Sequence, residues 1–103
     1  MKAVIEVGGL YASQNDDGTY GVCKVLALNF AVHVRIYRNR FPELPQDIDS
    51  SVLSQGRIGD PEGFGIGHAP MSQEGWLESH VFLKTEPVTE EELEGYRFYL
   101  EGM

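Results

Sequence analysis

Histidine is the side chain best suited to acid–base or metal chemistry near neutral pH, and the sequence has three. They are His33, His68 and His80, and none has a histidine or carboxylate two or four positions later, as recognisable metal-ligand motifs have. The sequence therefore predicts no metal site and no cofactor. His68 is the candidate catalytic residue, because a histidine in an irregular glycine-rich segment is better placed for chemistry than one on a strand.

Glycine recurs in residues 56–68, most densely at residues 63–67. Phosphate-binding loops use such glycines to bring backbone N–H groups close to an anion at a helix start. This segment lacks both the Gly-Lys-Ser/Thr ending and the third glycine of the dinucleotide pattern, and Asp60 and Glu62 would repel a phosphate. A structural role for the glycines is the stronger interpretation. A small enzyme or ligand-binding protein that uses residues 56–68 stays open as the alternative function.

Basic charge concentrates in residues 35–40, which hold three of the eight Lys and Arg residues. The candidate partner-binding residues are Arg35, Tyr37, Arg38 and Arg40. Alternation along the strand places the first two on one face together with His33, and we expect that face to be exposed and continued by the other two. Arginine and tyrosine are enriched at protein interfaces, which favours contact with another protein. A solvated strand face that pairs with helical glutamates is the alternative interpretation.

The composition disfavours several classes of protein. A net charge of -8 opposes the phosphate backbone of nucleic acids. The single cysteine, Cys23, excludes an internal disulfide framework and a cysteine-rich zinc site, and it fits a reducing compartment. No apolar run approaches the roughly 18 residues of a membrane span, and Glu6 interrupts any signal-peptide core. We therefore expect a cytoplasmic protein that binds neither nucleic acid nor membrane.

Alternating and β-branched segments predict an antiparallel sheet. The expected strands cover residues 2–7, 9–13, 19–28, 32–38 and 80–85. Residues 15–18, with sequence Asn-Asp-Asp-Gly, supply a turn and indicate a hairpin. Residues 41–68 contain three prolines and five glycines, and we expect them to form a long connection.

Helix signals dominate the C-terminal end. Thr89 and Glu92 form a capping box, which is the clearest helix start in the chain. The apolar stripe of that helix consists of Leu93, Tyr96 and Leu100. Ser72 is the expected N-cap of a second, short helix, and Asp49 is the expected cap of one or two further helical turns.

No internal repeat, charge block or linker divides the chain, so residues 1–103 are expected to form a single domain. Antiparallel strands followed by segregated helices predict the α+β class. The expected architecture is a small antiparallel, barrel-like sheet with a C-terminal helix and one or two short helices.

The run from Asp17 to Leu26, Asp-Gly-Thr-Tyr-Gly-Val-Cys-Lys-Val-Leu, resembles a hairpin entry of small immunity proteins from bacterial polymorphic toxin systems. The resemblance implies a non-enzymatic protein that binds and neutralises a cognate toxin, with the toxin gene as a neighbour. It assigns no functional residues. Together with the absence of a catalytic motif, it favours a small protein-binding module, whose partner and homo-oligomeric state stay open.

Overall fold

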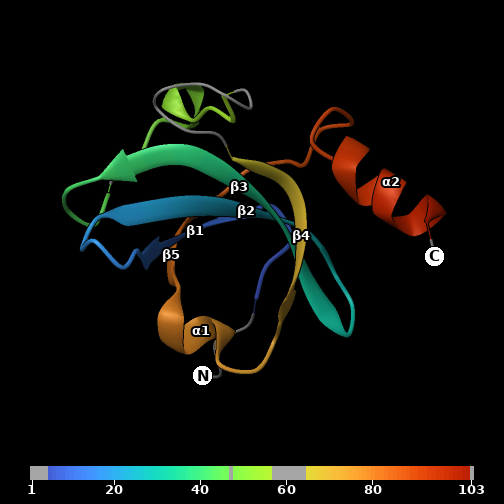
Figure 1. The fold of residues 1–103 in the computed structure, drawn as a ribbon, viewed down its shortest axis with the longest axis horizontal. Coiled ribbons are helices and arrows are strands. Elements are labelled where there is room, and N and C mark those ends of the chain that lie inside the picture. Colours follow the sequence, from blue (N-terminus) through green and yellow to red (C-terminus); the bar gives the residue numbers. More distant parts are fainter. Residues whose placement is uncertain (1–4, 47, 57–64, 103) are drawn as a thin grey trace.

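In the part of the chain that the computed structural model describes, residues 5–46, 48–56 and 65–102, five antiparallel strands form one sheet accompanied by two α-helices (Figure 1). The strands are β1 (Gly9–Gln14), β2 (Tyr20–Leu28), β3 (Ala31–Phe41), β4 (Ile66–Ser72) and β5 (Val81–Thr85), and the helices are α1 (Trp76–Ser79) and α2 (Glu94–Glu101). A single 3₁₀ turn covers Ser50–Val52. The strand order is β4-β3-β2-β1-β5. The α+β class is confirmed.

The predicted turn at residues 15–18 joins β1 to β2. The Asn15 N–H donates to the Thr19 carbonyl over 2.7 Å, and the Thr19 N–H donates to Asp17 Oδ1 over 2.9 Å. Gly18 has φ +89°, a conformation that glycine adopts without strain. The turn sets the register of the hairpin, in which Tyr11 lies opposite Cys23.

Both faces of the sheet bury apolar side chains. On one face, here called the Trp76 face, the buried cluster consists of Tyr11, Cys23, Val25, Val32, Val34 and Trp76. On the other, here called the α2 face, the buried cluster consists of Leu10, Val22 and Ile48, with Tyr37, Phe41, Leu53 and Leu83 packed against it. The sheet therefore needs a cover on each side.

The sheet is not closed into a barrel, so the barrel-like expectation is wrong. Closure would require β4 to pair with β5, and these are instead the two outer strands. Residues 73–80, which connect them, form α1 and place Trp76 on one face of the sheet, 5.8 Å from the Tyr11 ring in an edge contact. Figure 1 shows α1 between the ends of β4 and β5. The connection thus covers a face and leaves the two edges apart.

The short helices differ from the prediction in where they begin. Asp49 caps the 3₁₀ turn, with its carboxylate accepting the Ser51 N–H over 2.9 Å, as expected. Ser72 ends β4, and α1 begins only after Gly75, which has φ +76°. No described helix is long and apolar enough to cross a membrane.

Trp76 is 2% exposed, so its removal should leave a cavity in the core of the Trp76 face. We expect Trp76→Ala to lower the free energy of unfolding by about 3–5 kcal/mol. The neighbouring Leu77 is 38% exposed, and Leu77→Ala is the matched control, with an expected loss below about 1 kcal/mol. Urea denaturation of both variants measures the two losses. Equal losses would contradict the assignment of Trp76 as the core residue of α1.

Candidate functional site

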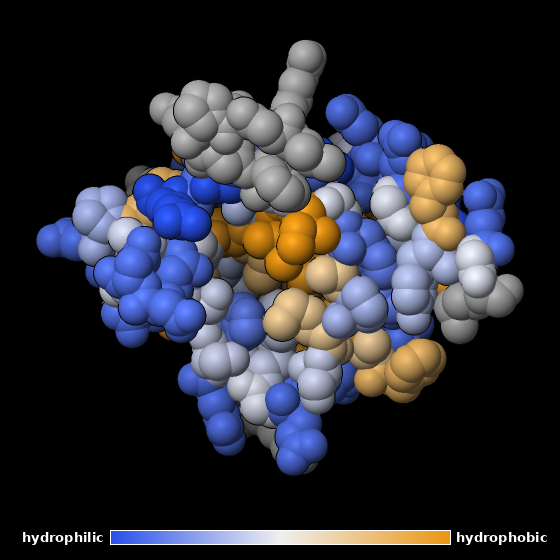
Figure 2. Space-filling view, viewed as in Figure 1, coloured by the Kyte–Doolittle hydropathy of each residue, from blue (hydrophilic) through white to orange (hydrophobic). Residues whose placement is uncertain are grey.

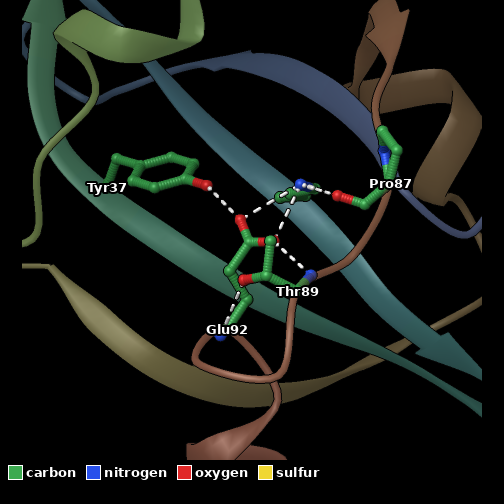
Figure 3. Close-up of polar contacts among 5 residues, drawn as sticks. Tyr37, Pro87, Thr89 and Glu92 are labelled. Carbon is green, nitrogen blue, oxygen red and sulfur yellow. Dashed lines mark hydrogen bonds and ion pairs between the residues drawn. The ribbon is translucent and has the colours of Figure 1, made fainter.

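A buried ammonium group lies at the centre of the α2 face. Lys24 is only 3% exposed, and it lies opposite Arg35 of β3, so two cations occupy neighbouring positions on one face. Lys24 Nζ contacts Glu92 Oε1 at 2.9 Å and Oε2 at 3.1 Å, and donates to the Pro87 carbonyl over 2.8 Å. Figure 3 shows this network around Glu92. The segment that precedes α2 therefore supplies the counter-charge of Lys24.

Glu92 is also part of the predicted capping box, whose hydrogen bonds are confirmed. The predicted helix start is wrong, because α2 begins at Glu94 with Leu93 as its N-cap, and the box closes the turn that precedes the helix. Its carboxylate accepts the Thr89 N–H over 2.8 Å, and its own N–H donates to Thr89 Oγ1 over 3.2 Å. The Tyr37 hydroxyl donates to Glu92 Oε2 over 3.4 Å. Burial raises the pKa of the Glu92 carboxyl, but hydrogen bonds from Thr89 and Lys24 and the Lys24 charge lower it more, so the net pKa lies below its usual value. Burial, reinforced by the Glu92 charge, raises the pKa of Tyr37 to about 12.

The ion pair should behave as a buried pair in a double-mutant cycle. Glu92→Leu leaves the Lys24 ammonium buried without its counter-ion and should cost about 3 kcal/mol. The double variant Lys24→Met/Glu92→Leu removes both charges and should recover most of that loss, except for about 1 kcal/mol from the lost cap. Glu94→Leu, at an exposed position of α2, is the matched control. If the double variant loses as much free energy of unfolding as Lys24→Met and Glu92→Leu lose together, the ion pair does not hold this segment on the sheet.

Two histidines of the sheet, His33 of β3 and His68 of β4, meet beneath α2. His33 Nδ1 lies 2.8 Å from His68 Nε2, and His33 Nε2 lies 3.1 Å from Asn29 Oδ1. Because Asn29 Oδ1 also accepts the Ala31 N–H over 2.9 Å, it is an acceptor, and His33 Nε2 must carry the proton. His33 Nδ1 then accepts a hydrogen bond from His68 Nε2–H. This assignment applies to a neutral His33, and burial favours the neutral form of both imidazoles because it lowers the pKa of each.

Tyrosines of α2 cover this histidine pair. The Tyr96 ring lies 4.7 Å from the His33 ring, and the Tyr99 ring lies 4.7 Å from the His68 ring, measured between centroids. Gly95 allows the close approach, because a Cβ there would lie 3.1 Å from the Gly67 carbonyl. The predicted apolar stripe is therefore wrong at Leu100, which is 45% exposed, and Tyr99 packs instead. A catalytic role for His68 stays a prediction, although its Nε2 is engaged by His33.

Acid should weaken the fold through the histidine pair. Burial lowers the pKa of His33, and burial together with the His33 charge lowers the pKa of His68. Below the unfolded value of about 6.5, the unfolded chain therefore binds more protons than the folded chain, and the free energy of unfolding falls as the pH falls through that window. Glu92 adds a separate loss below its usual pKa.

Denaturant titrations between pH 8 and pH 5 measure this dependence. His68→Gln keeps a donor for His33 Nδ1 but removes a titrating group, so it should flatten the pH dependence. His80→Gln is the comparator. Burial also lowers the pKa of His80, but this ring stacks on Trp76 and is not part of the histidine pair. A pH profile unchanged by His68→Gln would contradict the histidine assignment.

The Trp76 face holds an open hollow of about 300 Å³. Its floor is apolar and comes from Cys23, Val34, Ile36 and Met71. Its walls include Ser13, Asn15, Tyr37, Arg38, Arg40 and His80. Figure 2 shows apolar side chains in the middle of the displayed face, with hydrophilic side chains beside them at the end of β3. The hollow is thus a concave apolar surface with a basic rim.

The hollow exists because α1 is short. β3 has 11 residues and is about 35 Å long, whereas α1 has four residues and is about 6 Å long. Trp76 covers only part of the face. Val34 and Ile36 lie beyond it and form the floor together with Cys23, whose pKa burial raises to about 12, so its thiol stays protonated and uncharged.

The two walls of the hollow differ in charge. Arg40 pairs weakly with Asp17, with Nη1 and Oδ2 separated by 3.4 Å and both side chains at least half exposed. On the other wall, His80 stacks on Trp76 at 3.6 Å, and its Nδ1 donates to the Trp76 carbonyl over 3.0 Å. Burial lowers the pKa of His80, so the ring is neutral and its Nε2 is an acceptor. Cations therefore lie at one end of the hollow and a neutral acceptor at the other.

The structure separates the candidate partner-binding residues. The expected exposed face is wrong at His33, which has no exposed surface. Arg35 and Tyr37 on the same face are half-buried. The segment before α2 and α2 itself cover this face. Arg38 and Arg40 line the hollow instead. Tyr37 adjoins the hollow, but its side chain packs on the α2 face and donates to Glu92. Strand alternation contains this signal, since even-numbered positions of β3 share the face of Val34.

Sequence reasoning missed β4. It begins in the last three residues of the expected long connection, runs to Ser72, the expected helix N-cap, and carries Pro70, a residue tolerated in an outer strand. Gly65, just before it, lies so close to β3 that a Cβ would collide with the Ile36 carbonyl. The rest of the glycine-rich segment, residues 57–64, lies outside the described residues. Among the described residues, no group of three or more His, Cys, Asp or Glu side chains could hold a metal ion.

Comparisons with protein-family models, with curated proteins and with solved structures gave no match for this chain.

Proposed function

We propose that this domain is a protein-binding module that receives an acidic segment of its partner at the basic end of β3. The observation that carries the proposal is the hollow lined by Arg38 and Arg40, in a chain whose net charge is -8. A concave apolar surface with a few converging charged groups is the usual form of a binding site. Arginine is one of the residues most enriched among interface hot spots.

The distribution of charge over the molecule supports the same face. The outer side of α2 forms a shallow groove lined by Glu90, Glu91, Glu94, Arg97, Phe98 and Glu101. This acidic surface repels an acidic partner, whereas the end of β3 attracts one. Complementary potentials of this kind fix orientation and raise the association rate. The acidic side of the molecule therefore directs such a partner to the hollow.

An inhibitor of a toxin, as in bacterial immunity proteins, is the specific form of this function that we propose. Its support is the hairpin run from Asp17 to Leu26, which leads from the turn into β2. Asp17 is the residue that pairs with Arg40 at the rim of the hollow. The proposed partner is a toxin that presents an acidic segment.

A small enzyme that uses residues 56–68 has less support. Its candidate, His68, lies in β4 with Nε2 bonded to His33, and it is not among the residues that line the hollow.

Selection from a display library of random peptides tests the proposed function. We expect enrichment of peptides rich in aspartate and glutamate, with affinity that falls as the salt concentration rises. Arg40→Gln should lower the affinity for the selected peptides by roughly tenfold or more, because an interface arginine is lost. Arg97→Gln is the matched control, since Arg97 is also an exposed arginine that pairs with a carboxylate, that of Glu90, but lies on α2. Enrichment of basic peptides, or equal losses in both variants, would contradict the proposal.

A further inference from the structure

The hollow has room for one large side chain. Its volume of about 300 Å³ is at the lower limit of known ligand pockets, which enclose most of the surface of a drug-sized ligand. The hollow is also open to solvent on one side, so a bound group can continue into a longer chain. This shape fits a side chain that projects from a polypeptide.

The floor of the hollow selects an apolar group. Val34 and Cys23 are buried, Ile36 is partly buried, and Met71 is 37% exposed. The Cys23 thiol is protonated, so none of these four side chains brings a charge. A purely acidic segment would leave this apolar surface in contact with water or would place its own charges against it, which is unfavourable. The occupant of the floor therefore has to be apolar.

The arginines at the rim determine where a negative charge of the bound segment lies, which is at one end of the hollow. Arg38 and Arg40 extend from the same face of β3 as Val34 and Ile36, two and four positions further along. Asp17 pairs with Arg40, and their contact is long and solvent-exposed, so a carboxylate of the partner can replace it at little cost. At the opposite wall, the neutral His80 offers an acceptor to a backbone N–H of the bound chain.

From this geometry we infer that the segment bound in the hollow carries an aromatic or branched apolar side chain next to an aspartate or glutamate. The apolar side chain lies on Ile36 and Met71, which keep exposed surface, and the neighbouring carboxylate contacts Arg40 at the rim. The inference rests on the proposed function, since it specifies the chemistry of the acidic segment that the module receives.

Two short probes test the inference on the whole chain. The first is an acetylated tripeptide amide of aspartate, phenylalanine and glutamate, and the second has alanine in place of the phenylalanine. Titration of each is followed by NMR through the methyl groups of Val34, Ile36 and Met71. Burial of the phenyl ring should make the first probe bind about tenfold to a hundredfold more tightly. It should also shift those methyl resonances more strongly.

A blocking variant gives the second arm of the test. Ser13 lies on the wall of the hollow and shares its face with Tyr11, so Ser13→Leu fills part of the space. It should abolish the preference for the phenylalanine probe, whereas Ser51→Leu, at an exposed serine of the 3₁₀ turn, should keep it. The comparison of the two probes on the wild-type chain decides the question even if Ser13→Leu does not fold.

The outcomes separate the two proposals. Equal affinity for both probes, with Arg40→Gln weakening both, would overturn the apolar anchor and leave the acidic-segment module in place. No binding of either probe, together with no acidic enrichment in the peptide selection, would overturn both.

Discussion

Lys24 brings a charge into the α2 face of the sheet, directly opposite Arg35, and a charge at 3% exposure requires a partner. Glu92 provides it from a position 68 residues later, and the same carboxylate closes the capping box with Thr89. One side chain thus pairs with the buried cation and closes the turn that leads into α2. The course of residues 86–93 over β2 and β3 follows from this interaction.

The remainder of the α2 cover consists of contacts that are weak individually. No residue of α2 is buried, and its inner side meets β4 through Gly95 and the two tyrosines on the histidine pair. Such a helix depends on the neutral state of His33 and His68 and on the charged state of Glu92. The Trp76 face is covered differently, by one large ring, and this ring is too small for an 11-residue strand. The hollow is the consequence.

Local chemistry could be predicted from the sequence, and long-range contacts could not. The turn at residues 15–18, the Asp49 cap and the Thr89 capping box each depend on residues within four positions of one another, and all three are confirmed. The meeting of His33 with His68 joins positions 35 apart, through a strand whose proline argued against it. Neither the His33–His68 contact nor the Lys24–Glu92 pair produces a periodic pattern in the sequence. The sheet does not close into a barrel because of where Trp76 packs, and the spacing of apolar residues in the sequence does not predict that position.

The candidate site shows the same division. Alternation along β3 separates Arg35 from Arg38 and Arg40, yet which face stays open is decided by the length of α1 and by the anchoring of α2. The most direct measurement is therefore the structure of this chain bound to a selected acidic peptide. The account predicts an apolar side chain of the peptide over Ile36 and Met71, with a carboxylate in hydrogen-bond contact with Arg40. A peptide bound along the outer groove of α2, with the hollow unfilled, would contradict it.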